Sequence, residues 1–323
     1  MWLGLLRLGF IAVSEALLTL VRRLSLGPMR PTWTLKFEWL AMVLQRDTRA
    51  SRNETIALHR KRSEVMAGAP ELLGLQRIDE TIGGVPCVRL LHPRGAVGRP
   101  LLVYLHGGGM EGGSFETHGT LISALAQKCG LDALVPLYRL APEHPYPAGH
   151  DDVTAVIREL GKSTPLVLAG DSAGSLLLLG ACLRLRNERA PMPLRALAIC
   201  PWVDLAREAP SRIQGSRFDW CLREEWLHWA DTYAPKMDRE TPELSPVRAD
   251  LNGIPPLLVQ YGTAECIADE AHALCEQLRR ANVNVTEQPW LDMIHDWHIL
   301  AGQGIRPALD AIDAAARFLA GTP

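Results

Sequence analysis

The sequence has almost no excess charge, no internal repeat and no low-complexity tract. It carries 34 lysine and arginine residues against 36 acidic ones, a formal net charge of -2. Proteins that hold nucleic acid or another polyanion through their overall charge normally have a basic excess. The composition therefore gives no reason to expect a nucleic-acid partner.

The seven cysteines lack the pattern of a disulfide framework or a zinc site. Their number is odd, no C-x-x-C pair occurs, and several lie in apolar runs; they occupy positions 87, 129, 182, 200, 221, 266 and 275. This usage is typical of buried free thiols in a reducing compartment, which predicts a cytoplasmic location. Glu265, Cys266 and His272 are close in sequence, but nothing nearby completes a ligand set, so we expect no metal and no cofactor.

A long uninterrupted hydrophobic run is also missing, even from the most apolar segment, residues 2–26. Charges interrupt it, and no small-residue cleavage site precedes Gly27 and Pro28. This favours an amphipathic helix over a membrane span or a signal peptide. The apolar positions recur in steps of four and three and share one helical face; they are Leu6, Phe10, Val13, Leu17, Leu20 and Leu24.

Two roles stay open for this helix: packing over the domain, or contact with a membrane surface. Residues 1–65 carry eleven Lys/Arg and five Asp/Glu, so their local charge is 11 − 5 = +6, which suits the second role. Similar helical spacing recurs at 32–47. We expect residues 1–65 to form an N-terminal helical cap segment.

From about residue 75 the sequence alternates between short apolar runs and helical patterns. The opening pair IDETI and CVRLLHP is followed by runs at 101–106, 133–138, 165–170, 196–200, 255–262 and 283–290. Helical stretches lie at 117–129, 151–160, 173–187, 269–281 and 305–319. This alternation predicts an α/β fold with a mostly parallel, eight-stranded sheet covered by helices on both faces. We assign it to a domain at 66–323, with a cap insertion at about 203–250.

One strand-to-helix turn has the sequence of a nucleophile elbow. PLVLAGDSAGSLLLLGACLRLR reads as a strand, a G-D-S-A-G turn and a helix. Glycines at both ends of such a turn allow a strained backbone that exposes the serine hydroxyl at the carboxyl edge of the sheet. Ser172 is therefore the candidate nucleophile.

A second strand ends in His106-Gly107-Gly108-Gly109. Acyl transfer needs preformed N–H donors for the developing oxyanion, and consecutive glycines let a substrate approach the backbone. We expect the donors to be the amides of Gly107, Gly108 and Ala173.

The base must be a histidine, because a serine hydroxyl is a weak nucleophile without one. On this scaffold the histidine follows the last strand, which leaves His295 and His298. We favour His295, since it lies nearer the sheet edge, whereas His298 suits the start of the next element. His272 falls within a helical stretch and is expected at the surface.

The motifs taken together resemble the hormone-sensitive-lipase-like group of α/β-hydrolase esterases. Five of them occur in that family's order: HGGG at 106–109, YRLAPEHPYPA at 138–148, GDSAG at 170–174, PWVDL at 201–205 and MIHDW at 293–297. The resemblance spans roughly residues 75–320 and implies the same nucleophile, base and oxyanion donors. It also implies a cap built from the N-terminal helices and the segment after the sixth strand. The opening helices resemble those of bacterial acetyl-ester and steryl-acetate hydrolases.

The third triad member departs from the family's usual aspartate. The family's D-P-L-x-D-E pattern falls on Glu265 to Glu270, with Glu first and no proline. Glu265 lies three residues past Gly262, in the loop where a strand ends, so it can reach a histidine in the next loop. Asp269 and Glu270 suit the first turn of a helix, where acids complement the helix dipole. We favour Glu265 as the acid and keep Asp269 as the rival.

The resemblance and these residues imply a serine carboxylesterase that hydrolyses short-chain acyl or acetyl esters through an acyl-enzyme. Three alternatives remain: a lactone hydrolase or amidase with the same triad, a membrane-attached lipid-ester hydrolase, and a non-catalytic ligand receptor. The partners expected are a small-molecule ester and, through the N-terminal helix, a membrane surface; a homodimer is left open.

Overall fold

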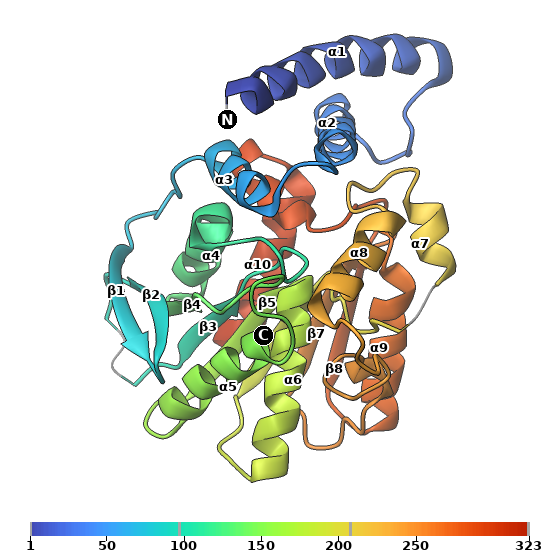
Figure 1. The fold of residues 1–323 in the computed structure, drawn as a ribbon. Coiled ribbons are helices and arrows are strands. Elements are labelled where there is room, and N and C mark those ends of the chain that lie inside the picture. The colour runs from blue at the N-terminus through green and yellow to red at the C-terminus, as the bar shows by residue number, and fades with distance from the viewer. Residues whose placement is uncertain (1, 96–97, 207–208, 322–323) are drawn as a thin grey trace.

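Eight strands form a single sheet in the computed structural model, which describes residues 2–95, 98–206 and 209–321 (Figure 1). Their order across the sheet is β1-β2-β4-β3-β5-β6-β7-β8. β1 pairs with β2, and β2 with β4, in antiparallel register, while the remaining pairs are parallel. The strands are β1 (Gln76–Ile82), β2 (Val85–Leu91), β3 (Leu101–Leu105), β4 (Ala133–Pro136), β5 (Leu166–Asp171), β6 (Arg195–Ile199), β7 (Leu257–Gly262) and β8 (Val285–Trp290). The prediction of a mostly parallel, eight-stranded sheet is confirmed.

Helices cover both faces of this sheet. α5, α6 and α9 enclose one apolar core with the sheet, and α4 and α10 enclose the other. The helices are α1 (Trp2–Leu26), α2 (Leu35–Ser51), α3 (Ile56–Ala67), α4 (Phe115–Cys129), α5 (Ala148–Gly161), α6 (Ala173–Glu188), α7 (Pro210–Gly215), α8 (Arg223–Tyr233), α9 (Ala268–Arg280) and α10 (Arg306–Ala320). Two short 3-10 helices span Pro246–Arg248 and Trp297–Gln303. Strands β3, β4, β5 and β7 are buried along their whole length, and β6 is buried except at Arg195, which explains their apolar sequences.

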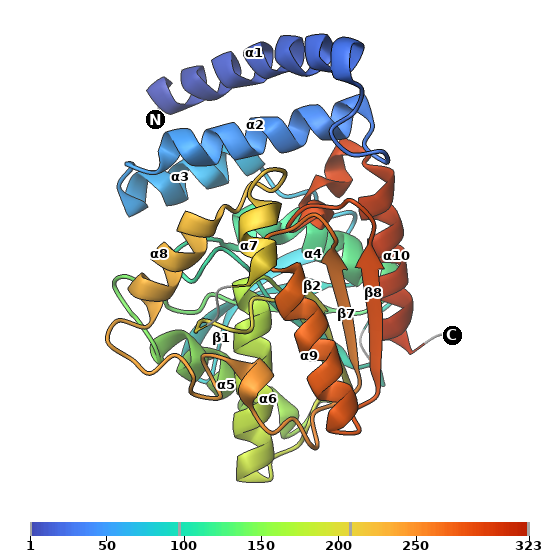
Figure 2. The ribbon, with the colours of Figure 1, turned by 90° about the vertical axis from the view of Figure 1, so that its right-hand side faces the viewer.

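Segments far apart in sequence meet above the carboxyl ends of the parallel strands. The segment between β6 and β7 carries α7 and α8, and it lies beside the N-terminal layer of α1, α2 and α3 (Figure 2). Gln45 of α2 donates to the carbonyl of Asp219 at 2.7 Å, which ties the layer to the β6–β7 segment. Arg30 and Thr32 bind the carboxylate of Asp292 at 2.8 and 2.9 Å, which ties it to the loop after β8. The N-terminal layer therefore fixes both loops.

α1 lies across α2 on the far side of the layer from the sheet (Figures 1 and 2). Its apolar face, expected to cover the domain if the helix packs there, instead points outward: Leu6, Phe10 and Leu17 are 68%, 69% and 64% exposed. The polar face turns inward because α2 presents charged partners to it. None of the described helices is long and apolar enough to cross a bilayer.

Candidate active site

Ser172 occupies the turn between β5 and α6, where the backbone is strained. Its φ of 51° and ψ of -120° are unusual for a residue with a side chain. The turn needs glycine at Gly174, because a Cβ there would lie 2.0 Å from the Leu105 carbonyl oxygen. The Ser172 amide donates to Ile199 at 2.8 Å and fixes the turn against β6. The local geometry is that of a nucleophile elbow.

A continuous row of hydrogen bonds joins Ser172, His295 and Glu265. His295 Nε2 lies 2.9 Å from Ser172 Oγ, and His295 Nδ1 lies 2.9 Å from Glu265 Oε2. All three side chains are buried. The structure thus brings the three predicted triad residues together, in the order that lets the carboxylate hold the imidazole with Nε2 toward the serine.

Burial and neighbouring carboxylates shift the pKa values of this row. Burial raises the pKa of Glu265 to about 7. For His295, burial lowers the pKa, but the carboxylates of Asp296 and Glu265 outweigh it and hold the pKa well above its ordinary value. The two neighbouring carboxylates therefore stabilise the imidazolium that forms when His295 accepts a proton.

The remaining candidate acids and histidines have other partners. Asp269, in the first turn of α9, accepts from the Ser211 amide at 3.0 Å. Glu270 forms a buried ion pair with Arg212 of α7 at 2.7 Å. His272 is exposed and pairs with Glu287, whereas His298 is buried and lies 3.1 Å from Gln260 Oε1. None of these groups reaches Ser172 among the hydrogen bonds of the described residues.

The glycine loop after β3 differs in part from the expectation. The Gly107 amide donates to Asp171 Oδ2 at 2.9 Å, so its only N–H is already engaged. In this conformation the Gly107 N–H thus points to Asp171, and its role as an oxyanion donor stays a prediction. Within the described chain, the Gly108 amide has no hydrogen-bond acceptor, and the Ala173 amide opens α6, where backbone N–H groups lack helical partners. These two remain as candidates.

A carboxylate from the β6–β7 segment, Asp219, holds the base and acid loops together. Its Oδ1 accepts from the His295 amide at 3.0 Å and its Oδ2 from the Cys266 amide at 2.8 Å. The side chain is fully buried, and burial raises its pKa to about 6. The sequence offers no signal for this role, because Asp219 lies in an irregular segment far from both loops.

Asp296 is a second residue that the sequence analysis missed. Its Oδ2 lies 3.1 Å from His295 Nε2, the nitrogen that also faces Ser172. Its other oxygen is buried without a hydrogen-bond partner in the described chain. The residue stands next to the predicted base in the sequence, and a backbone φ of 48° turns its carboxylate toward the imidazole. Proximity in sequence alone does not reveal such a turn.

Two tryptophans of the β6–β7 segment contact the base directly. Trp226 stands edge-on to the His295 ring with centroids 5.0 Å apart, and Trp220 Nε1 donates to the His295 carbonyl at 2.7 Å. A third, Trp229, lies against the glycine loop, since a Cβ on Gly109 would approach its ring to 2.3 Å. This aromatic cluster thus packs around the site.

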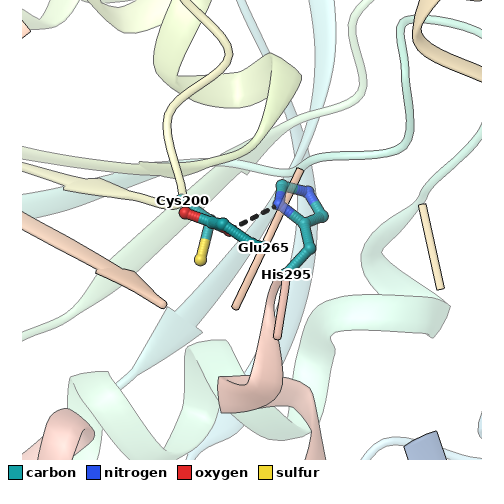
Figure 3. Close-up of side chains that lie close together, drawn as sticks. All are labelled: Cys200, Glu265 and His295. Atoms are coloured by element: carbon teal, nitrogen blue, oxygen red, sulfur yellow. Dashed lines mark hydrogen bonds and ion pairs between the residues drawn. The ribbon is translucent and has the colours of Figure 1, made fainter. Parts of the chain in front are cut away.

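Cys200 lies beside Glu265 (Figure 3). Its sulfur, a Glu265 oxygen and a His295 nitrogen lie within 4.8 Å of one another. Cysteine, glutamate and histidine can together bind a metal ion. Here, however, His295 Nδ1 is bound to Glu265 and Nε2 faces Ser172, so both nitrogens already have partners. We interpret the cluster as two members of the hydrogen-bonded triad, Glu265 and His295, with the Cys200 thiol packed beside them.

The sheet order and the strand–turn–helix that carries Ser172 define an α/β hydrolase. Comparison with known proteins supports the same class. The model of a family described as having the alpha/beta hydrolase fold matches residues 102–299. An acetyl-hydrolase from Streptomyces hygroscopicus is 36% identical over 257 residues, covering 74% of this chain and 85% of that protein. A carboxylesterase, NlhH, from Mycobacterium tuberculosis is 30% identical over 266 residues, covering 75% and 82%.

Solved structures give the same result. A crystal structure of an esterase from the bacterial hormone-sensitive lipase family superposes with a TM-score of 0.82 at 31% identity, covering 88% of this chain and 97% of that one. The chain therefore belongs to the α/β-hydrolase family, in its hormone-sensitive-lipase-like group of esterases.

Proposed function

We propose that the chain is a serine carboxylesterase that hydrolyses short-chain esters through an acyl-enzyme. The observation that carries this proposal is the row Ser172–His295–Glu265, whose two hydrogen bonds are each 2.9 Å long. The family's esterases and the acetyl-hydrolase relative support the reaction class.

In the proposed mechanism, His295 removes the proton from Ser172 Oγ as that oxygen attacks the ester carbonyl. Glu265 stabilises the imidazolium that forms, and its bond to Nδ1 keeps Nε2 toward the serine. The amides of Gly108 and Ala173 receive the oxyanion. The leaving alcohol takes the proton from His295, and water then repeats the sequence to release the acid.

A small acyl group suits the surroundings of the site. Trp226 packs on His295, and Trp229 packs on the glycine loop. Both aromatic side chains belong to the β6–β7 segment, and we infer from their positions that the space for an acyl group is small. The printed name of the acetyl-hydrolase relative is consistent with this proposal.

We propose that the two parts of the chain have different roles. Residues 1–65 act as a cap segment and 66–323 as the catalytic domain, with the insertion at about 203–250 completing the cap. A cytoplasmic location is supported by the seven cysteines, all buried and none in a disulfide.

The test is the variant Ser172→Ala assayed with p-nitrophenyl acetate. We expect turnover to fall at least about a thousandfold, because the nucleophile is removed while binding remains. The control is Ser211→Ala, which removes a buried hydroxyl that bonds Cys266 O in the acid loop without touching the triad. Turnover by Ser172→Ala close to that of the wild type would refute the proposed function.

A further inference from the structure

The outer face of α1 is a continuous apolar strip with no protein against it. We define this outer face as Leu6, Phe10, Val13, Leu17, Leu20 and Leu24, all of them exposed. Exposed large apolar side chains elsewhere in the described chain are scattered over several elements. Contiguous apolar patches of this kind mark interaction surfaces.

Polar contacts hold α1 in this orientation. Arg7 binds Glu54 at 2.7 Å, and Glu15 binds Arg46 at 2.6 Å. Arg22 and Arg23 both pair with Glu38, which is fully buried in α2. Rotating α1 to bury its apolar side chains would take both arginines away from Glu38, and an unpaired buried charge is strongly destabilising. The outward display of the apolar strip is thus built into the fold.

The charges of residues 2–65 differ in exposure. Every acid of that segment is buried or half-buried, whereas its exposed charged residues are all basic. These are Lys36, Arg49, Arg52 and Lys61, of which Arg52 also pairs with acids of α8. The exposed surface of the layer therefore combines an apolar strip with positive charge.

We propose that α1 lies flat on an anionic phospholipid surface, with its outer face among the acyl chains, and that the net positive charge of residues 1–65 attracts the headgroups. This combination is what binds amphipathic helices to membrane interfaces. α1 is the outermost helix on its side of the molecule (Figure 2), so a planar surface can reach it. A second copy fits less well, since a twofold contact would bring like positive charges together.

What membrane docking would mean for the choice of substrate rests on the proposed esterase function. α2, directly beneath α1, reaches the loop of Asp219, and Asp219 in turn binds the His295 amide. Docking through α1 would therefore hold the catalytic loops near the lipid surface. The substrates favoured are apolar esters dissolved in that surface.

The test measures binding without hydrolysis. The Ser172→Ala protein, full length, is sedimented with vesicles of phosphatidylglycerol and phosphatidylcholine, and with phosphatidylcholine alone. We expect binding to the anionic vesicles that weakens in high salt. Adding Phe10→Asp should lower the bound fraction about tenfold, because a charge enters the apolar strip. Ile213→Asp on α7 is the matched control, since Ile213 and Phe10 are both 69% exposed.

Circular dichroism and the unfolding midpoint verify that each variant is folded. Absence of wild-type binding to anionic vesicles, or equal loss with Ile213→Asp, would overturn the proposal. Sedimentation velocity tests the alternative that a second copy of the chain binds the strip. A dimer at micromolar concentration that Phe10→Asp dissociates would assign the strip to that second copy and overturn the proposal. None of these readouts depends on esterase activity, so a failure here leaves the proposed function to its own test.

Discussion

Helices α1 and α6 are both leucine-rich, yet they lie in opposite surroundings. The leucines of α6 are buried on every side, because the helix sits between the sheet and the β6–β7 segment. Those on the outer face of α1 are exposed, because the segment beneath that helix offers it charged partners. Composition thus predicts helix in both places. The neighbours decide which face is covered.

The difference in burial matches a difference in task. α6 begins at Ser172, so a helix packed on all sides fixes the position of a strained residue. α1 carries none of the proposed triad, and its packing leaves a surface available for contact. This comparison can be tested by substitutions in and near each of the two helices.

The largest effect on kcat is expected for the triad of Ser172, His295 and Glu265, whose serine directly precedes α6. Glu265→Gln removes the charge that stabilises the imidazolium, and the amide can hold the wrong tautomer. We expect kcat to fall by about 10³ to 10⁴. Asp269→Asn, in the first turn of α9, should change kcat by less than about threefold, because Asp269 bonds only a backbone amide of α7. If Asp269→Asn gave the larger loss, the assignment of the acid would be wrong.

A smaller effect compares one leucine from each helix. Leu178 of α6 is fully buried, whereas Leu17 of α1 is 64% exposed. Leu178→Ala should lower the free energy of unfolding by about 2–5 kcal/mol through a cavity. Leu17→Ala should change it by about 0.5 kcal/mol or less. Urea unfolding of both variants measures this, and similar losses would show that α1 is buried in solution.

Much of the catalytic region could be predicted because its sequence signals are local. Each central strand is a short apolar run, and GDSAG places Ser172 at a turn whose geometry requires glycine. His295 and Glu265 follow from chain order along a fixed sheet topology. These inferences need no knowledge of how distant segments meet.

The remaining features depend on contacts between segments far apart in sequence. Asp219 meets the acid and base loops only because the β6–β7 segment folds over them. The engagement of the Gly107 amide depends on Asp171, 64 residues away. Likewise, the outward face of α1 depends on acids of α2. Periodicity identifies an apolar face but not the surface that it meets.

The smallest predicted effect concerns Asp296, the carboxylate beside the catalytic imidazole. Apart from the two tryptophans, the groups near His295 are Ser172 and Asp296 at Nε2, Glu265 at Nδ1, Cys200 beside Glu265, and Asp219 at the backbone. The Asp296 charge raises the pKa of His295, so the rate should rise with pH through that raised value. In Asp296→Asn the charge is lost and the pKa of His295 falls.

The base is then neutral at lower pH, and the acid limb of the kcat/KM profile should move to lower pH. The limb is read from the pH of half-maximal kcat/KM, so a change in the plateau does not obscure it. Asp269→Asn, whose carboxylate is not in contact with the triad, is the control and should leave the limb in place. A limb that stays fixed in Asp296→Asn, or that moves to higher pH, would mean that the Asp296 carboxylate does not control the charge of the base.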